Sequence, residues 1–280
     1  MINWKSIPKI DAHIHLLPSD VIKANIDCDD PFVKNGDVKD YINLMKKYNV
    51  VQSFIVPFND PYMMSMDFKI ETVHQNLKRM VERYPSALCF FADIDIRKSI
   101  NETLEELENV IKSKGCLGIK IHPTNAAYPI DGEYYNQIFD FADKNNILVE
   151  IHSYPREQLK DDLCSPSRIK NVLNRYPNIR ISIAHLGGFQ YEDLIGTKAY
   201  LNISAVLPDL VNRFGITKIN EILRKLGVEK LVFATDYPDS RCLKSEEIYD
   251  KYFEILEQMD FSQKEAEDIC KNNALKMIKK

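Results

Sequence analysis

The chain has 280 residues, of which 45% are hydrophobic and 28% are charged, and its 41 acidic and 37 basic residues give a net charge of −4. This is the composition of a folded globular protein with a sizeable core, and it excludes a largely disordered chain. The basic residues form no block, so we expect no nucleic-acid partner. No apolar run has the length of a signal peptide or a membrane span, so we expect a cytoplasmic protein that contacts no membrane.

Short apolar runs rich in β-branched residues alternate with longer helical patterns, which is typical of βαβ units and predicts a parallel sheet. The predicted strands span residues 10–15, 50–58, 87–95, 115–123, 147–152, 179–186, 200–206 and 230–237. The predicted helices span residues 38–48, 70–84, 100–114, 133–145, 166–176, 218–226, 246–259 and 262–280. Eight strands close a barrel, so we expect an α/β fold, a (β/α)8 TIM barrel, in which residues 1–280 form a single domain.

One connection in this pattern is unusually long. Residues 16–37, after the first strand, make a segment of about 20 residues where such connections usually take roughly 2–6. The segment could be a lid that faces the substrate or a plain excursion over the surface, and the sequence leaves both interpretations open.

Histidines gather where the predicted strands end. Of the six in the chain, only His74 lies in a predicted helix. The other five lie at or next to the C-terminal end of a strand: His13, His15, His122, His152 and His185. Barrels of this kind hold their chemistry at that end of the strands, so we expect these imidazoles to surround one site.

The residue types at these strand ends suit a metal site. His13 and His15 are two residues apart in a strand, so both side chains project from the same face and can reach one ion. His152 and Asp236 each stand as a strongly polar residue at the end of a mainly hydrophobic strand, with the side chain expected to face inward. Three imidazoles and one carboxylate suit one divalent ion, zinc first and manganese second, with a position left for water. A His-x-His pair alone would fit two hydrogen-bonded strand histidines equally well.

Six motifs follow one another along most of the chain. They are Ile-Asp-Ala-His-Ile-His at 10–15, Gly-Ile-Lys-Ile-His-Pro at 118–123, Ile-His at 151–152, Ala-His-Leu-Gly-Gly at 184–188, Thr-Asp-Tyr-Pro at 235–238 and Asn-Asn-Ala at 272–274. With these motifs the chain resembles the amidohydrolase superfamily, and within it the amidohydrolase-related branch that is like aminocarboxymuconate-semialdehyde decarboxylase.

The resemblance implies roles for five of these side chains. His13, His15, His152 and Asp236 would ligate the metal, as their positions at the strand ends also suggest. His185 would polarise the substrate or move a proton, and Asp236 would also be able to deprotonate a metal-bound water.

The fourth strand bears on how many metal ions are held. The resemblance implies that binuclear relatives bridge two metals with a carboxylated lysine or a glutamate on this strand. Here Lys120 and His122 project from the same face, and His122 lies nearer the strand end. The pattern therefore favours a mononuclear site.

Three charged residues are expected one layer below the ligands. Strand alternation turns Asp11, Lys120 and Glu150 into the barrel, where they would orient the ligands from below. Because a lone buried charge is costly, we expect Lys120 to pair with at least one of the two carboxylates. An error of one residue in the register of a strand would instead turn its charge to the opposite face.

Four residues are predicted to contact the substrate. His122 lies beside the predicted ligands, while Arg156, Tyr237 and Arg241 lie in the connections that follow the fifth and eighth strands. Arginines over the mouth would bind a substrate carboxylate through paired hydrogen bonds. Arginines in loops are also often merely solvated.

The predicted function is metal-dependent hydrolysis of a small amide, lactone or ester by a metal-activated water, with Asp236 and His185 as the catalytic residues. A non-oxidative decarboxylase or hydratase of a small carboxylic acid would use the same ligands. A non-catalytic metal-binding barrel is a second alternative, although a structural zinc site needs no additional imidazole such as His185. A metal nuclease fits least. Apart from a small-molecule substrate, the expected partner is a second copy of the chain in a homodimer, as the resemblance allows.

Overall fold

The computed structural model describes residues 2–239 and 244–279, and in it eight strands lie side by side in chain order. The strands are β1 (Lys9–Ile14), β2 (Val50–Ile55), β3 (Leu88–Ala92), β4 (Cys116–Ile121), β5 (Leu148–Ile151), β6 (Arg180–Ile183), β7 (Tyr200–Asn202) and β8 (Leu231–Val232). All neighbouring pairs are parallel. The segment after β8 pairs with β1 through a parallel bridge between Ile14 and Tyr237, so the ring closes into the predicted TIM barrel.

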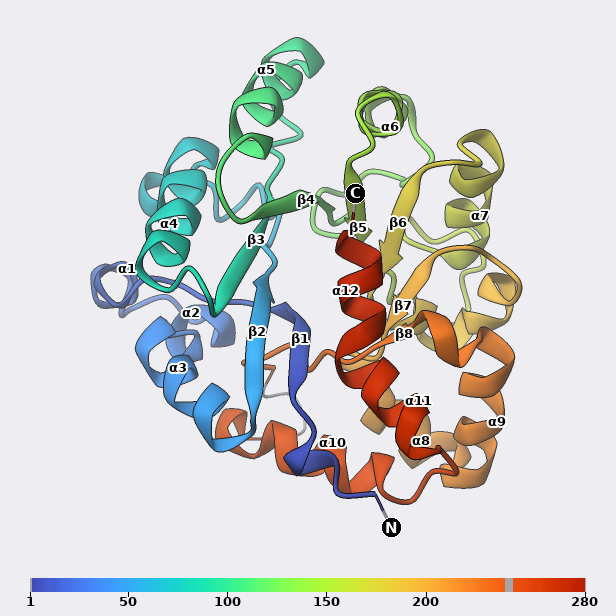
Figure 1. Ribbon diagram of the computed structural model, residues 1–280. Helices are drawn as coiled ribbons and strands as arrows, with labels where there is room; N and C mark the ends of the chain where they lie inside the picture. The colour runs from blue at the N-terminus through green and yellow to red at the C-terminus, as the bar shows by residue number, and fades with distance from the viewer. Residues whose placement is uncertain (1, 240–243, 280) are drawn as a thin grey trace.

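Helices pack around the outside of the strands (Figure 1). The main ones are α3 (Val38–Lys47), α4 (Ile70–Arg83), α5 (Ile100–Ile111), α6 (Glu133–Lys144), α7 (Pro166–Arg175), α8 (Val206–Phe214), α9 (Ile216–Leu226) and α10 (Ile248–Leu256). Their ends follow local signals, such as the capping box of Ser99 and Glu102 that starts α5. Among the described residues, no helix is both long and apolar enough to cross a bilayer.

The end of the seventh strand differs from the prediction. The strand was expected to reach Val206, but it ends at Asn202, and Val206 begins α8. Asn202 and Ser204 turn their side chains towards His185, and Ala205 adopts a positive φ of 55°. This arrangement stops the ladder and turns the chain into a helix that the apolar pattern alone did not reveal.

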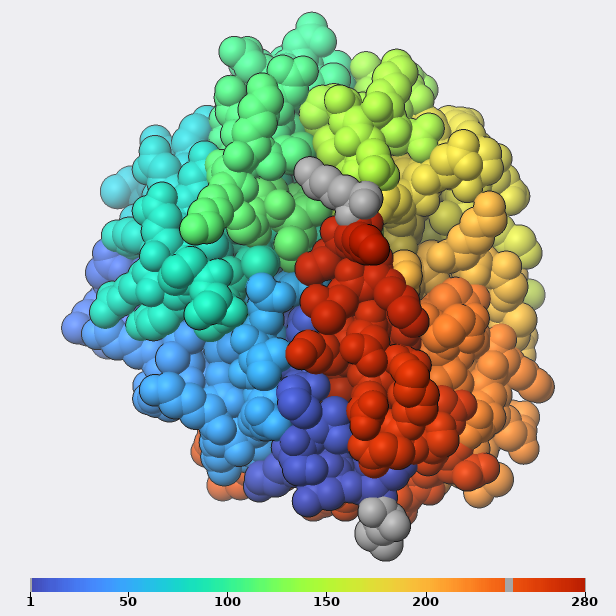
Figure 2. All heavy atoms as spheres, in the orientation of Figure 1, coloured from blue at the N-terminus to red at the C-terminus, as the bar shows by residue number. Residues whose placement is uncertain are grey.

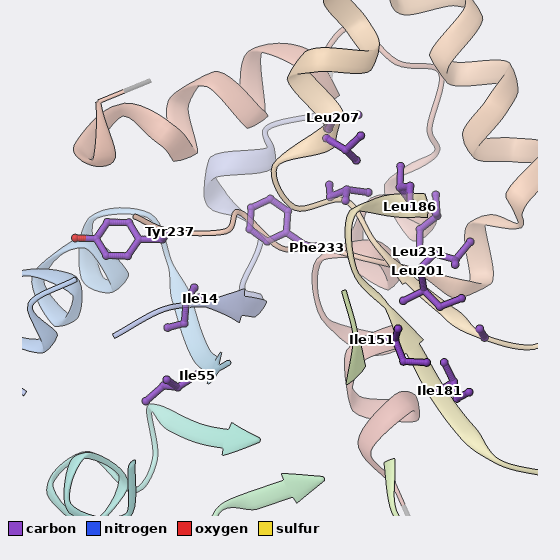
Figure 3. Packing of buried hydrophobic residues seen from close by; sticks show 14 of the residues in the cluster. Ile14, Ile55, Ile151, Ile181, Leu186, Leu201, Leu207, Leu231, Phe233 and Tyr237 are labelled. Atoms are coloured by element: carbon purple, nitrogen blue, oxygen red, sulfur yellow. The ribbon is translucent and has the colours of Figure 1, made fainter. Parts of the chain in front are cut away.

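The largest core lies between the strands and the surrounding helices (Figure 3). Ile14, Ile55 and Ile151 project outward from their strands and are almost fully buried. Each such side chain contributes about 1.5–3 kcal/mol when it leaves water. The same packing fixes the height at which each strand ends, and so positions the polar residues that follow.

The C-terminal segment covers the other end of the barrel. It comprises α11 (Gln263–Glu267), a π-helical turn and α12 (Asn273–Ile278). Ala274 and Met277 of α12 share a buried cluster with Ile10 and Val232, which lie near the starts of their strands. Figure 2 shows this segment in red across the centre of that face. Only the C-terminal ends of the strands are left to hold a site.

The long connection after β1 is folded and contains α1 (Ser19–Ala24) and α2 (Pro31–Asn35). Its two ends are held together, since the amide of Leu17 donates to the carbonyl of Gly36 at 2.8 Å and the amide of Val38 donates to that of Leu17 at 3.2 Å. Leu17 also shares a small buried cluster with Val33 and Phe68. The connection is therefore a packed element that returns to the rim of the barrel.

Candidate active site

A cavity of about 280 Å³ opens at the C-terminal ends of the strands. Its floor comes from the ends of β1, β4, β5, β6 and β8: His13, His15, His122, His152, His185 and Asp236. Its wall comes from the connections beyond the strands: Asp30, Phe32, Phe58, Asp60, Met63, Asn125, Tyr154 and Ala205. The five histidines that the sequence places at strand ends therefore meet around one cavity.

A β-bulge in β1 positions the His-x-His pair. Asp11 pairs with Ser53 and Ile14 pairs with Ile55, so β1 advances by three residues where β2 advances by two. The extra residue shifts the alternation of side chains between the two faces by one position. As a result His13 faces the cavity, whereas Asp11 faces the helices.

The predicted place of Asp11 below the ligands is therefore wrong. Its carboxylate accepts hydrogen bonds from the hydroxyl of Tyr249 on α10, at 2.6 Å, and from the amide and hydroxyl of Thr235, at 3.0 and 2.6 Å. Burial raises the pKa of Asp11 to about 6, although these hydrogen bonds act to lower it. Because Thr235 precedes Asp236, Asp11 fixes the backbone next to Asp236 from the side of the barrel wall that faces the helices.

His13 and His15 both present a ring nitrogen to Asp236. Nδ1 of His15 donates to the carbonyl of Val56 at 2.7 Å, and Nδ1 of His13 lies 2.7 Å from Glu150. Burial opposes ionisation of Glu150, but contact with His13 lowers its pKa below the ordinary value, so His13 is the donor in this pair. Nε2 of each ring is left to face Asp236 Oδ1, at 3.1 and 3.4 Å respectively.

Asp236 completes an electronegative cluster. Burial opposes its ionisation, but the surrounding imidazoles, His185 first, lower its pKa well below the ordinary value. Its Oδ1 is buried and accepts no hydrogen bond from the described residues. Burial lowers the pKa of His13, but its carboxylate partners raise it above the ordinary value, so a proton there can supply the positive charge that the cluster needs. A metal ion would supply the same charge, and ligating histidines commonly donate their other nitrogen as these do.

His185 and His152 lie next to this cluster. Nδ1 of His185 donates to the carbonyl of Ser204 at 3.0 Å, and Nε2 lies 3.0 Å from Nδ1 of His152. His152 is thus the donor in that contact, which leaves its own Nε2 with a lone pair. Ligand atoms of His13, His185 and Asp236 lie within 4.8 Å of one another. The three side chains that lie close enough to hold an ion therefore include His185, which was predicted to act in catalysis.

Residues 10–280 match the family model described as Amidohydrolase. The chain belongs to the amidohydrolase family. It is an enzyme of the amidohydrolase superfamily with a candidate divalent-metal site, as its motifs suggest. No curated protein matches it.

Several solved structures share the fold of this amidohydrolase. One is 2,6-dihydroxybenzoate decarboxylase from Rhizobium, with 12% identity over 97% of this chain and 98% of that chain and a TM-score of 0.70. Another is 5-carboxyvanillate decarboxylase from Novosphingobium aromaticivorans with manganese, with 12% identity, coverage of 98% and 96%, and a TM-score of 0.72. A third is a probable 2-pyrone-4,6-dicarboxylic acid hydrolase from Acinetobacter baumannii, with 17% identity, coverage of 97% and 99%, and a TM-score of 0.67.

His122 of the amidohydrolase stacks on His152, with ring centroids 3.7 Å apart. Burial, followed by the nearby charge of Lys120, lowers the pKa of His122 well below the ordinary value, so the ring is neutral. Its Nδ1 accepts a hydrogen bond from the backbone amide of Asn125 at 3.2 Å. Nε2 must then carry the hydrogen, which makes His122 a hydrogen-bond donor on the cavity.

The expected ion pair of Lys120 does not form. Its Nζ is fully buried and has no hydrogen-bond partner among the described residues. Burial lowers the pKa of Lys120 to about 8, although nearby Glu150 acts to raise it. Glu150 instead binds His13 and accepts a hydrogen bond from the side chain of Asn202 at 3.0 Å. Asp11 is on the other face of the barrel wall, and Glu150 uses Oε1 for His13 and Asn202, so neither predicted carboxylate pairs with Lys120.

Two predicted substrate contacts do not line the cavity of the amidohydrolase. Tyr237 is 3% exposed, and its hydroxyl donates to the carbonyl of Asn35 at 3.3 Å. The side chain of Arg156 is 70% exposed and is paired with Asp162 at 2.9 Å. Arg241 lies outside the described residues. Of the three predicted contacts that lie within the described residues, His122 is the one that lines the cavity.

Some site residues were not singled out from the sequence. Asn202 and Ser204 bind His185, and their polar side chains at the end of an apolar strand were a signal that could have found them. Phe32 and Phe58 reach the ring of His15, each with centroids 4.8 Å away. Both lie in connections between elements, and no local sequence pattern shows that these connections fold back to the site.

Proposed function

We propose that this amidohydrolase holds one divalent ion through His13, His15, His152 and Asp236, and that it removes CO2 from a small aromatic or unsaturated carboxylic acid without an oxidant. The observation that carries the proposal is that lone pairs of His13 and His15 converge on the unpartnered Oδ1 of Asp236. Acceptor atoms that face each other in a buried site are stabilised by a proton or a metal ion between them. His152 offers a further Nε2 lone pair at the edge of the same group.

The donor set suits more than one metal. Imidazole and carboxylate together bind zinc or manganese, and one ligand position would remain for substrate or water. Two related decarboxylase structures contain manganese, which supports manganese at least as well as zinc. When bound, the ion would supply Lewis acidity that holds the carboxylate of the substrate and stabilises negative charge on its oxygens.

The walls of the cavity favour an aromatic or conjugated substrate. The rings of Phe32 and Phe58 lie 5.5 Å apart beside His15 and form an apolar surface. Flat apolar surfaces of this kind hold a planar ring by stacking or edge contact. Decarboxylases of substituted benzoates with the same fold support this choice over an aliphatic amide.

The side chains on the floor can provide what decarboxylation needs. When the bond to the carboxyl group breaks, its electron pair stays on the substrate carbon, and a proton must reach that carbon. Asp236 is ionised and can take a proton from water in the cavity and pass it to that carbon. Burial lowers the pKa of His185 to about 3, so its ring is neutral. The Nε2 hydrogen of His122 would bind a substrate oxygen and orient the ring.

Hydrolysis is the second candidate, and it uses the same residues. The probable 2-pyrone-4,6-dicarboxylic acid hydrolase that shares the fold supports it. Asp236 would then take a proton from the attacking water, and His122 or His185 would bind the carbonyl oxygen of the substrate.

The experiment that separates the two candidates uses metal-loaded enzyme and a panel of hydroxybenzoic acids and lactones in D2O. Decarboxylation releases CO2 and leaves one deuterium on the carbon that lost the carboxyl group, as NMR and mass spectrometry would show. Asp236→Asn should lower that rate by about 10²–10⁴-fold, the usual contribution of an acid–base group. Asp29→Asn, on an exposed side chain, is the matched control. Ring opening of a lactone without CO2 release would instead establish hydrolysis.

A further inference from the structure

The wall of the cavity carries negative charge. Asp30 and Asp60 line it together with Asp236 of the floor, and among the described residues no lysine or arginine lines it. Neither Asp30 nor Asp60 forms an ion pair with any residue in the described ranges. Three carboxylates outweigh one divalent ion when the imidazoles are neutral, so the cavity remains negative with the metal in place.

Each of the two wall carboxylates uses one oxygen to fix its own backbone. Oδ1 of Asp30 caps α2 by accepting from the amide of Phe32 at 2.8 Å, and Oδ1 of Asp60 accepts from the amide of Tyr62 at 2.9 Å. These contacts hold the side chains in place without neutralising their charge. The second oxygen of each accepts no hydrogen bond from the described part of the chain.

The other polar groups on the wall are arranged to accept hydrogen bonds. The side-chain nitrogen of Asn125 donates to the carbonyl of Phe58 at 2.9 Å, which leaves its side-chain oxygen to accept a hydrogen bond from a ligand. The hydroxyl of Tyr154 donates to Asp209 at 2.5 Å, so its hydrogen is not available to a substrate. A ligand group near this wall would thus meet acceptors and negative charge.

Cationic side chains close to these connections are bound to other carboxylates. Arg97, which reaches the carbonyl of Met64, pairs with Asp95 at 2.8 Å. Lys34 at the end of α2 pairs with Asp29 at 3.0 Å. Neither cation is turned to the cavity, so the wall keeps its own charge.

We propose that Asp30 and Asp60 select a substrate whose end remote from the metal carries a cationic amine. The inference rests on the proposed function, in which the acid group of the substrate lies at the metal on the floor. The aromatic body would lie along Phe32 and Phe58, and the ammonium group would bind at the carboxylates that line the wall. A substrate with a second carboxylate at that end would be repelled.

Three benzoates that differ only at the remote position test this selection. They are 4-(aminomethyl)benzoate, 4-methylbenzoate and benzene-1,4-dicarboxylate, which carry a positive, a neutral and a negative group there. Calorimetric titration of the metal-loaded protein measures binding and does not depend on turnover. We expect affinity to fall in that order, on the order of tenfold between the cation and the dianion, which two partly exposed charge contacts can supply. The difference should shrink as salt is added.

Variants assign the preference to the wall. Asp30→Asn with Asp60→Asn removes both charges, and asparagine still caps α2. We expect the three affinities to come within about threefold of one another, whereas Asp27→Asn, an exposed control on the same connection, should keep the full order. Equal binding of the dianion and the cation by the parent protein would overturn the inference, as would a preference that survives in the double variant. Failure of all three benzoates to bind the metal-loaded protein would overturn the proposed function and the inference together.

Discussion

The floor and the wall of the cavity are built in different ways. On the floor, the Nδ1 atoms of His13, His15 and His185 each bind a partner on a strand or just beyond its end, at 2.7–3.0 Å. On the wall, the carboxylates of Asp30 and Asp60 bind only their own local backbone. The strands thus hold the reacting groups in one orientation, whereas the connections supply charge that can select a substrate.

The two regions also differ in what supports them. Floor residues such as His13 and His185 are 1% and 3% exposed and lie in β1 and directly after β6. Strand β6 pairs with β5 and β7, and β1 pairs with β2 and is bridged to the segment after β8. On the wall, α2 has only five residues, too few for a helix to be stable by itself. It depends on the cap from Asp30 and on Val33 in the small cluster beneath it. Substitutions should therefore impair metal binding when they fall on the floor and change substrate preference when they fall on the wall.

The largest expected effect comes from the partner of His13. Glu150→Gln removes the charge that accepts from Nδ1 of His13, and metal affinity should fall by about 10–100-fold, as is usual when the partner of a ligating histidine is lost. Competition with a chelator measures the affinity. Glu106→Gln is a matched control, because Glu106 binds Nδ1 of His74 at the same 2.7 Å but lies away from the cavity. Equal affinity in the two variants would show that Glu150 does not orient a ligand.

A smaller effect is expected behind the floor. Tyr249→Phe removes the hydroxyl that donates to buried Asp11, and leaving that carboxylate short of a donor should cost about 1–3 kcal/mol in the free energy of unfolding. Denaturant titration measures the loss, and Tyr62→Phe on a 94% exposed side chain is the control. Metal affinity should fall less than in Glu150→Gln, because Asp11 binds Thr235 and the backbone amide of His13 and contacts no ligating side chain. Unchanged stability would mean that another donor replaces the hydroxyl.

Most of the fold could be predicted from the sequence because the strands and helices repeat regularly. Each of the eight predicted strands is present, although most end a few residues early. The ladder from β4 to β5 is regular, with Lys120 opposite Glu150, and there the alternation rule placed His122 and His152 correctly on one cavity. The alternation rule gave the wrong face for Asp11, because the bulge in β1 shifts the side chains after it to the opposite face. The bulge has no clear signal in the sequence.

The polar partners in the site were harder to predict than the imidazoles. Glu150 was expected to neutralise Lys120, but His13 and Asn202 compete for the same carboxylate and lie closer to it. Which of several buried partners binds a charge depends on distances of about an ångström, and strand spacing does not resolve these. Residues 16–37 were one possible substrate-facing segment, but their individual wall residues were not predicted, since Phe32 reaches the site only when α2 packs back onto the barrel.

The smallest expected effect is at Arg156, which the sequence placed over the mouth as a carboxylate-binding group. Its side chain is 70% exposed and already paired with Asp162, so it does not line the cavity. Arg156→Ala should therefore change the affinity for 4-methylbenzoate by less than about twofold, as calorimetric titration would show. Asp60→Asn, measured in parallel with 4-(aminomethyl)benzoate, should weaken binding. If Arg156→Ala weakened 4-methylbenzoate tenfold, an arginine would be binding the acid group at the mouth, and the negative wall would not be what selects the substrate.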